Sequence, residues 1–336
     1  MSKFIKNGTV VLENKPSVKG FAAAVGKNEG EGPLGEFFDF VSSDDTLGEE
    51  SWEKAEKKLQ QLALEKAAAK AKIAQEDIDF LFAGDLLNQC VSSGYNAREL
   101  KIPFAGLYGA CSTMAESLCF AAIFADNLLG DNLAALTSSH FCSAERQFRF
   151  PLNYGGVRTP TAQWTATASG CAIVGRSQEP PYLRAVTFGC VKDMGVTDTN
   201  NMGAAMAMAA YETISTHLKN TGLTPRDFDL ILTGDLGKVG SDILVELFAR
   251  EKTDISAVHN DCGMMLYNPQ KQDVHAGGSG CGCSASVLCG YVLDKVRRGE
   301  LKNVLFAATG ALMSPTVLQQ GESIPGISHA VHISTE

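Results

Sequence analysis

The sequence has few of the features that mark membrane, secreted or disordered proteins. Its best apolar run, 304–313, is far shorter than the roughly 20 residues that a membrane-spanning helix needs. Residues 1–15 contain no apolar stretch of the kind that a signal peptide carries. Proline is scarce, with 11 residues in 336, and 45% of the residues are hydrophobic, which excludes a disordered or low-complexity chain. We therefore expect a folded, soluble protein of the cytoplasm.

Positive charge is also in deficit. The 29 Lys and Arg residues face 38 Asp and Glu residues, so the net charge is −9 with His neutral. Such a field repels phosphate backbones and anionic lipids, and we expect no nucleic-acid partner. The ten cysteines accompany no export signal, which favours reduced and mostly buried thiols over a disulfide framework.

The chain contains two similar halves. Residues 77–86 read Asp-Ile-Asp-Phe-Leu-Phe-Ala-Gly-Asp-Leu, and residues 227–236 read Asp-Phe-Asp-Leu-Ile-Leu-Thr-Gly-Asp-Leu. Each segment follows a stretch with helical periodicity and has the apolar run of a buried strand. A repeated pattern of helix, acidic turn, strand and Gly-Asp predicts a duplicated structural unit.

A second repeated pattern supports this prediction. A predicted helix at 111–129, ended by Gly130, precedes a strand at 133–137, and a predicted helix at 281–298, ended by Gly299, precedes a strand at 304–308. Alternating helices and apolar strands predict an α/β fold with covered sheets. We expect two βαβ-rich halves, 1–190 and 191–336, related by a pseudo-twofold axis. Segments 40–50 and 143–160 are predicted as surface insertions, the second covering a site.

Cys111 is predicted at the turn between an apolar strand and an amphipathic helix. Unpaired backbone N–H groups at a helix start favour a thiolate, so we expect a lowered pKa for this thiol. This is the setting of a cysteine nucleophile. The alternative is that Cys111 only fills a tight strand–helix junction, as many buried cysteines do.

A metal site is an alternative interpretation of four other residues. His259, Cys262, Cys281 and Cys283 offer one imidazole and three thiols, a possible ligand set for structural zinc. The Cys-x-Cys spacing is tighter than usual, and the glycine-rich segment 277–283 also reads as a turn into a long helix.

The motif around Cys111, Gly-Ala-Cys-Ser-Thr-Met-Ala-Glu-Ser, and the internal duplication resemble thiolase-like condensing enzymes, including 3-oxoacyl-[acyl-carrier-protein] synthase III. Several further segments resemble the stage V sporulation protein AD family of spore-forming bacteria: Gly30–Gly35, Ala83–Asn88, Thr137–His140, Ala144–Arg149, His259–Gly263 and Ala276–Gly280. The resemblance implies a thiolase-like fold with a layered α/β/α/β/α core. It also implies binding of dipicolinic acid (pyridine-2,6-dicarboxylate) and its uptake, with calcium, into the developing spore.

Two departures from the condensing enzymes bear on activity. Where those enzymes place a histidine, this chain has Gly234 or Asp235, and where they place an asparagine it has Cys281. Without these donors nothing stabilises the enolate or oxyanion of a condensation, and one lost donor typically costs about 10²–10³ in rate. We therefore expect a non-catalytic binding protein. The alternatives are an acyl-transferring condensing enzyme with Cys111 as nucleophile and a relocated histidine, and an interaction scaffold.

A dicarboxylate in the inherited pocket needs local positive or donor groups. The predicted ligand-binding residues combine the Cys111 turn with hydroxyls, imidazoles, guanidinium groups and an amide: Cys111, Asn88, Ser138, Ser139, His140, Arg146, Arg149 and His259. For the arginines the alternative is a solvated loop face, and for the histidines a neutral imidazole in the fold. Asp85 and Asp235 end equivalent strands and are possible calcium ligands, although an Asp at such a position commonly caps a helix.

No cofactor is expected apart from calcium accompanying the ligand. The resemblance further implies a homodimer, peripheral association with the spore inner membrane, and other stage V sporulation membrane proteins as partners.

Overall fold

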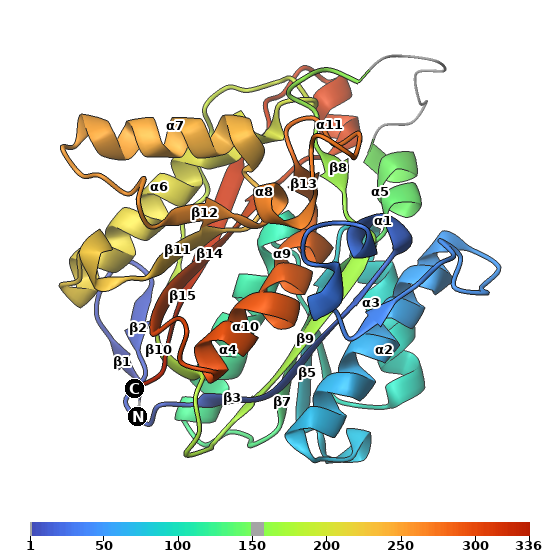
Figure 1. The fold of residues 1–336 in the computed structure, drawn as a ribbon, viewed down its shortest axis with the longest axis vertical. Coiled ribbons are helices and arrows are strands. Elements are labelled where there is room, and N and C mark those ends of the chain that lie inside the picture. Colours follow the sequence, from blue (N-terminus) through green and yellow to red (C-terminus); the bar gives the residue numbers. More distant parts are fainter. Residues whose placement is uncertain (1, 149–157) are drawn as a thin grey trace.

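The computed structural model describes residues 2–148 and 158–336. Ten strands form one continuous sheet path in the order β12-β11-β14-β15-β10-β3-β9-β7-β5-β6 (Figure 1). Their bounds are β3 Ser17–Val25, β5 Phe80–Asp85, β6 Phe104–Gly106, β7 Leu133–Ser139, β9 Ala168–Gly175, β10 Tyr182–Phe188, β11 Leu230–Thr233, β12 His259–Asp261, β14 Asn303–Ala311 and β15 Gly326–Ser334. Short strands β1 Lys3–Phe4, β2 Thr9–Val11 and β4 Phe40–Val41 join this sheet, while β8 Trp164–Thr165 pairs with β13 Gly278–Ser279.

The sheet consists of two sets of five strands with the same internal order. In the first set, β5 lies parallel to β6 and β7, and β9 and β3 follow antiparallel. In the second set, β11 lies parallel to β12 and β14, and β15 and β10 follow antiparallel. The sets meet where β3 pairs with β10. The duplication read from the sequence is therefore a duplication of topology.

The helices repeat in the same way. They are α1 Lys27–Gly30, α2 Trp52–Ala71, α3 Val91–Leu100, α4 Thr113–Asp126, α5 Phe141–Phe148, α6 Met202–Thr221, α7 Gly237–Arg250, α8 Cys262–Leu266, α9 Cys281–Val287, α10 Leu293–Arg297 and α11 Pro315–Gln319. Helices α2 and α3 cover the first set of strands, and α6 and α7 cover the second. Helix α4 contacts strands of both sets, and α9 with α10 lies beside it in the middle layer (Figure 1). This is the predicted α/β/α/β/α layering.

The domain division at residue 190 remains a prediction. The strand order places β10 in the second set of strands, where it takes the position that β3 has in the first. A boundary that follows the repeat therefore falls between β9 and β10.

One predicted helix end differs from the structure. Helix α4 ends at Asp126, and the left-handed residue after it is Leu128, with φ 61°, rather than Gly130. The equivalent prediction for Gly299 holds, because this glycine has φ 73° just after α10. The helix predicted over 281–298 is also interrupted, since a π-helical turn, Leu288–Val292, lies between α9 and α10. Gly290 in that turn faces the Phe38 ring at a distance that leaves no room for a side chain.

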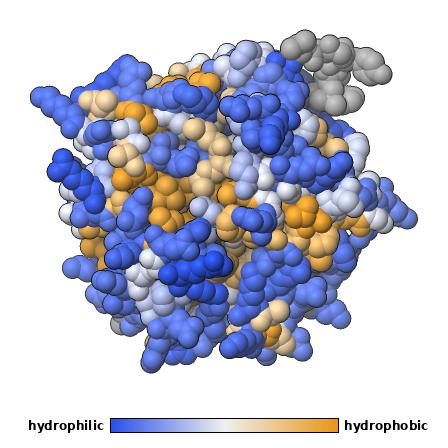
Figure 2. All heavy atoms as spheres, in the orientation of Figure 1, coloured by the Kyte–Doolittle hydropathy of each residue, from blue (hydrophilic) through white to orange (hydrophobic). Residues whose placement is uncertain are grey.

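Apolar side chains on the covered faces form the core. The largest cluster joins α4, α9 and strands of both sets, with Met114, Leu118, Val287 and Phe306 fully buried. Polar residues cover most of the face shown in Figure 2, and its apolar residues gather in separate patches. Among the described residues, no helix combines the length and the apolar character needed to cross a membrane.

Candidate functional site

Cys111 lies at a strained turn in the middle of the molecule. The chain leaves β6, passes through a 3₁₀ turn, Ala110–Ser112, and enters α4. Ala110 has φ 49°, in the left-handed region that a residue with a side chain adopts at a cost of about 1 kcal/mol. Such strain is typical of turns that hold a functional side chain in place. The turn leaves Cys111 5% exposed, at the floor of a cavity.

The cavity is narrow and mostly apolar. Its empty volume is about 430 Å³, including the part open to solvent. Side chains from both halves of the chain line it: Leu86, Tyr108, Ala110, Cys111, Ala144, Glu145, Phe148, Thr165, Met202, Ser279, Ala311 and Met313. An apolar cleft with a few polar groups is the usual form of a small-molecule site.

The Cys111 thiol meets a carboxylate at the floor of this cavity. It lies close to Asp235, which is fully buried and whose charge acts on the thiol. Asp235 accepts from the Thr309 hydroxyl at 2.9 Å, the Gly280 N–H at 2.9 Å and the Ser279 hydroxyl at 3.1 Å. Cys281 is the second thiol at this point and packs against Cys111. Asp235, one of the two residues predicted at the histidine position of the condensing enzymes, and Cys281, predicted at their asparagine position, thus both lie near Cys111.

The expected lowering of the Cys111 pKa is wrong. Burial and the charge of Asp235 raise this pKa well above its ordinary value. Burial likewise raises the pKa of Asp235 to about 6, which leaves it largely ionised at neutral pH. The positive dipole end of α4 favours a thiolate, but its effect is too small to offset the negative charge of Asp235 close to the sulfur. At neutral pH Cys111 is a thiol and not a thiolate.

The predicted serine ligands lie outside the cavity lining. Ser138 donates to Glu56 at 2.8 Å, and Ser139 donates to the carbonyl of Ala166 at 2.6 Å. Both are completely buried at the end of β7 and hold the surrounding elements together. Their hydroxyls are therefore structural in this arrangement.

The two predicted histidines are neutral. His140 contacts the carbonyl of Asp45 at 2.7 Å, and His259 contacts the Thr233 hydroxyl at 3.1 Å. Burial lowers the pKa of both, to about 4 for His259. Neither lines the cavity, so the expectation of imidazolium groups facing an anion is wrong.

The predicted arginine and asparagine positions lie at or near the surface. Arg146 forms an ion pair with Glu53 and lies over the Trp52 ring, with half of its side chain exposed. Asn88 is exposed, and its backbone N–H donates to Gln147. Neither lines the cavity. Arg149 lies outside the described residues.

Neither metal hypothesis gains support. Among the described residues, no group of three or more His, Cys, Asp and Glu side chains is placed to hold a metal ion. Asp85 accepts from the N–H groups of Leu87 and Ser93, so it caps the start of α3, as the alternative interpretation predicted. The Asp235 carboxylate accepts from the N–H of Gly280 at the start of α9. It was predicted instead to cap α7, the helix that follows it in the sequence. In the proposed zinc set, the Cys281 thiol donates to the carbonyl of Ser138.

Sequence reasoning missed most of the polar lining. Tyr108, Glu145, Thr165 and Ser279 surround Cys111, and Thr165 donates to Glu145 at 3.3 Å. Two of them had a signal: Glu145 and Ser279 lie inside segments that carried the family resemblance. Thr165 and Tyr108 had none, because their place in the cavity depends on pairing between β8 and β13 and on the turn before α4.

Comparison with known proteins identifies the family. A family model described as "Stage V sporulation protein AD (SpoVAD)" matches residues 6–334. The chain belongs to the stage V sporulation protein AD family. A relative of that name from Bacillus subtilis (strain 168) is 44% identical over 323 residues, which cover 96% of this chain and 95% of the relative. The chain is thus a sporulation protein by family.

Solved structures place this chain in the thiolase-like fold. It is similar to 3-oxoacyl-[acyl-carrier-protein] synthase III from Aquifex aeolicus VF5, with TM-score 0.58, 13% identity and coverage of 95% of this chain and 99% of the other. It is also similar to human mitochondrial 3-ketoacyl-CoA thiolase, with TM-score 0.61, 13% identity and coverage of 96% and 99%. At these identities the likeness shows the fold alone.

Proposed function

We propose that this protein binds dipicolinic acid in the Cys111 cavity without catalysis, and that this binding serves the uptake of dipicolinate and calcium into the developing spore. The observation that carries the non-catalytic part is the position of the buried Asp235 carboxylate close to the Cys111 thiol, where burial and the charge of Asp235 raise the pKa of the thiol. The ligand itself is proposed from the family resemblance.

Electrostatics at the cavity floor argue against condensation. The negative charge that develops on oxygen in an acyl-transfer transition state needs hydrogen-bond donors or cations close by. Asp235 lies at this point as an acceptor with a negative charge, and Cys281 offers a thiol that already donates to a carbonyl. A thiol whose pKa is raised is also a weak nucleophile at neutral pH.

The walls of the cavity suit a flat aromatic ring. Leu86, Phe148, Met202 and Met313 provide apolar surface that an aromatic ring can contact. The Tyr108 hydroxyl is a donor for a carboxylate oxygen, whereas the hydroxyls of Thr165 and Ser279 already donate to Glu145 and Asp235.

Helix α6 offers a place for a carboxylate. Met202, its first residue, lines the cavity. No side chain caps its start, and its first turn contains no acidic residue. The free N–H groups and positive dipole end of such a helix favour an anion.

Calcium is proposed to accompany the ligand. Glu145 lines the cavity and Asp235 lies at its floor, so a bare dianion meets like charge there. A calcium ion bound to dipicolinate cancels the charge of the two carboxylates. We therefore expect calcium to raise the affinity for dipicolinate.

The wider setting follows from the family resemblance as part of the same proposal. We expect a homodimer that associates peripherally with the spore inner membrane and contacts other stage V sporulation membrane proteins. Co-purification of those proteins with a tagged chain from sporulating cells tests this part, and a chain recovered alone contradicts it.

Calorimetric titration with dipicolinate, with and without calcium, tests the binding. Isophthalate has the same shape without the ring nitrogen and serves as the ligand control. Ala144→Leu fills the cavity and should weaken binding at least about tenfold, about 1.4 kcal/mol. Cys190→Ala, a change at an exposed thiol outside the lining, should leave binding unchanged. Failure of native protein to bind dipicolinate under all these conditions contradicts the proposal and favours a scaffold.

An acyl-transferring enzyme is the alternative, and the strained Cys111 turn at a cavity floor is the observation in its favour. Mass spectrometry after incubation with acyl-CoA separates the two functions. We expect no acyl group on Cys111. Stoichiometric acylation of Cys111 in the wild type, absent from Cys111→Ala, would establish the enzyme instead.

A further inference from the structure

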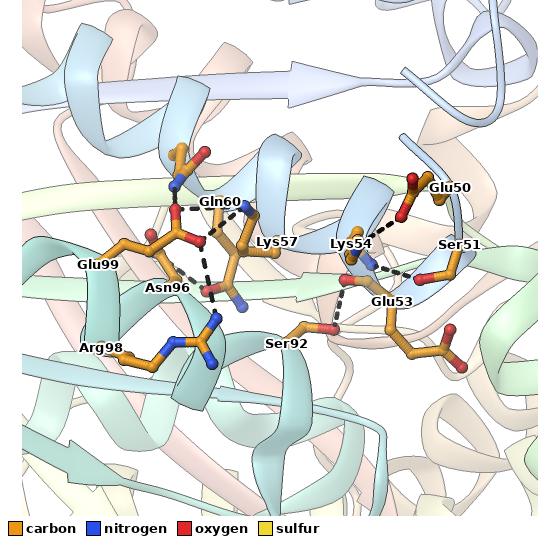
Figure 3. A network of polar contacts seen from close by, with 11 residues as sticks. Glu50, Ser51, Glu53, Lys54, Lys57, Gln60, Ser92, Asn96, Arg98 and Glu99 are labelled. Atoms are coloured by element: carbon orange, nitrogen blue, oxygen red, sulfur yellow. Dashed lines mark hydrogen bonds and ion pairs between the residues drawn. The ribbon is translucent and has the colours of Figure 1, made fainter. Parts of the chain in front are cut away.

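A buried network of hydrogen bonds connects α2 to the wall of the Cys111 cavity. Its centre is a pair of carboxyl groups, Glu56 on α2 and Asp85 at the end of β5, which are 1% and 0% exposed. Gln60, also on α2, joins the two through Ser93 and Ser138. Figure 3 shows the side of the network between α2 and α3, where Asn96 donates to Gln60 at 3.3 Å.

The donors around Asp85 fit an ionised carboxylate. It accepts from the N–H of Leu87 at 3.0 Å, and from the N–H and hydroxyl of Ser93 at 2.8 and 2.7 Å. The amide of Gln60 donates to the Ser93 hydroxyl at 2.9 Å, which fixes the Ser93 proton on the side of Asp85. Three donors and no proton of its own are what a carboxylate requires.

The hydrogen bonds of Ser143 indicate that Glu56, unlike Asp85, carries a proton. Ser143 Oγ lies 3.0 Å from Glu56 Oε2 and 3.1 Å from the carbonyl oxygen of His140. One hydroxyl proton cannot serve both acceptors. A proton on Glu56 Oε2 removes the conflict, because the carboxyl then donates to Ser143 and Ser143 donates to His140. Ser138, which receives a proton from Gln60 at 2.8 Å, donates to Glu56 Oε1.

Charges around Glu56 favour the same protonation state. Burial and the charge of Asp85 raise the pKa of Glu56 to about 8. The groups facing it from other elements are the Asp85 carboxylate of β5, the Cys281 thiol of α9, and hydroxyls of α3, β7 and α5. The neighbouring cation, Arg146, pairs with Glu53 at the surface. Two carboxyl groups in one buried site therefore share one negative charge.

Helix α5 connects this pair to the cavity. Its residue Ser143 bonds to Glu56, and its residues Ala144, Glu145 and Phe148 line the cavity. The hydroxyl of Ser143 also closes the first turn of α5 onto the carbonyl of His140. The position of the cavity wall thus depends on the group that Ser143 faces.

We propose that the single proton held by the Glu56–Asp85 pair fixes α5 against α2 and thereby controls ligand binding in the Cys111 cavity, a regulation that rests on the function proposed above. When this proton leaves Glu56, Ser143 must turn its hydroxyl to the new carboxylate and give up its bond to His140. Two negative charges then face each other without water, and the first turn of α5 loosens. Alkaline pH therefore opens the wall of the cavity and weakens binding.

The tryptophans report on this helix. The chain has two, and each contacts α5: Trp52 lies beneath Arg146 with the guanidinium carbon 5.2 Å from the ring, and Trp164 stacks on Phe141 at 4.0 Å between ring centroids. Any displacement of α5 changes the surroundings of one or both indoles. Tryptophan emission thus follows the helix without a label.

A pH titration of tryptophan emission in the ligand-free protein tests the proposal. We expect one reversible transition near pH 8 in the wild type and none in Glu56→Gln, whose amide can still bond to Ser143 without titrating. Glu116→Gln removes a half-buried carboxyl elsewhere, on α4, and Glu29→Gln removes a buried one that accepts from the Thr167 N–H; both should keep the transition. An unchanged emission from about pH 6.5 to 9 in the wild type overturns the proposal, even if Glu56→Gln fails to fold.

Titration with calcium-dipicolinate at pH 7 and pH 9 completes the test. Both ligand carboxylates are ionised throughout this range. Wild-type affinity should fall about tenfold per pH unit above the transition, whereas Glu56→Gln should bind equally at both values. If the emission transition is present but no binding is found at any pH, the proposed ligand is wrong, while the control of α5 by the proton is supported. Equal wild-type binding at both pH values, without a transition, refutes the proton control alone.

Discussion

The Asp235 carboxylate accepts hydrogen bonds from Ser279, Gly280 and Thr309, and it lies close to the Cys111 thiol. A carboxylate at this place stabilises the neutral thiol, and it also ties α9 to the strand that precedes α7. The same residue therefore disfavours the thiolate of Cys111 and contributes to the fold. Its loss affects both, and the two effects can be measured separately.

Cys111 is expected to resist alkylation in the native protein. Its raised pKa leaves little thiolate at pH 7.5, and its sulfur is almost fully buried. Iodoacetamide at this pH should modify the exposed Cys190, and peptide mass spectrometry should find Cys111 unmodified over the same time. All ten cysteines should react in urea. Modification of native Cys111 as fast as Cys190 would mean that Cys111 is an accessible thiolate in the folded protein.

Replacing Asp235 by alanine should destabilise the protein strongly. Donors of Ser279, Gly280 and Thr309 would remain buried without their acceptor, which costs about 3 kcal/mol or more in the free energy of unfolding. Chemical denaturation measures this change. Asp242→Ala removes an exposed carboxylate of α7 and should change stability by less than about 0.5 kcal/mol. A similar small change for Asp235→Ala would show that its hydrogen bonds are not needed.

At the residue scale, the sequence pointed to Cys111, which lines the cavity, but not to most of the polar side chains around it. Cys111 could be found because a strand–helix turn has a clear local pattern. Ser138, Ser139 and His140 lie in a segment with family resemblance, but the resemblance reflects their packing and hydrogen bonding at the end of β7. Whether a side chain faces a cavity depends on the other half of the chain, which local pattern does not contain.

Strand β6 is an open edge of the sheet. Within residues 2–148 and 158–336 it pairs only with β5, on one side, and its three residues are exposed. Phe104, the first residue of this strand, is 39% exposed, and Tyr108, two residues after its end, is 43% exposed; both are large exposures for aromatic side chains. An unprotected edge with apolar side chains invites pairing with another strand. Across a twofold axis, β6 of one copy would meet β6 of a second copy in antiparallel pairing.

Phe104→Glu should therefore weaken the proposed homodimer. Symmetry brings two copies of the new carboxylate close together at the interface, and we expect the dissociation constant to rise at least about tenfold. Sedimentation velocity measures the monomer fraction. Met264→Glu, at a side chain with 40% exposure on α8, is the matched control and should leave the association unchanged. An unaltered dimer in Phe104→Glu would assign the interface to another surface.

Most elements could be predicted from the sequence, and the exceptions have local causes. Strands β5, β7, β11 and β14 are apolar runs within covered sheets, which makes them easy to recognise. Helix α4 ended earlier than predicted because Leu128 adopts the left-handed conformation expected of a glycine. The π-helical turn in the last long helix could not be predicted from local sequence. It accompanies the packing of Phe38 against Gly290, a contact between residues far apart in the chain.

At the scale of the whole molecule, the two halves share one strand order, but the side chains at equivalent positions have different partners. The equal strand order of the two sets could be expected from two matching segments, 77–86 and 227–236. The chemistry does not repeat: Asp85 caps α3 and pairs with Glu56, whereas Asp235 lies close to Cys111 and caps α9. Duplicated positions have thus acquired different partners, and these differences could only be seen once both halves were placed together.

Buried carboxyl groups make stability depend on pH. Burial raises the pKa of Glu29 and Glu116 to about 7 and that of Glu56 to about 8, from an ordinary value of 4.5. The folded state therefore keeps protons that the unfolded chain releases above pH 4.5. The stabilisation is complete below this value and is lost as the pH rises through about 7 to 8.

Buried histidines act in the opposite direction. Burial lowers the pKa of His259, His329 and His332 to about 4, and that of His217 to about 3, from an ordinary value of 6.5. The unfolded chain binds protons below pH 6.5 that the folded state does not accept. Their contribution is present above about pH 6.5 and is lost as the pH falls toward about 4.

The two sets together predict a broad stability maximum in mildly acidic solution. Between about pH 4.5 and 6.5 their slopes oppose each other, whereas above about pH 6.5 only the carboxyl groups act. We expect the melting temperature to be at least about 2 °C higher at pH 6 than at pH 8.5. Calorimetry of Glu56→Gln should show a smaller difference, because this residue releases its proton last, and exposed Asp242→Ala should show the full one. A melting temperature that rises toward pH 8.5 would mean that these carboxyl groups are ionised in the folded protein, against the proton assigned to Glu56.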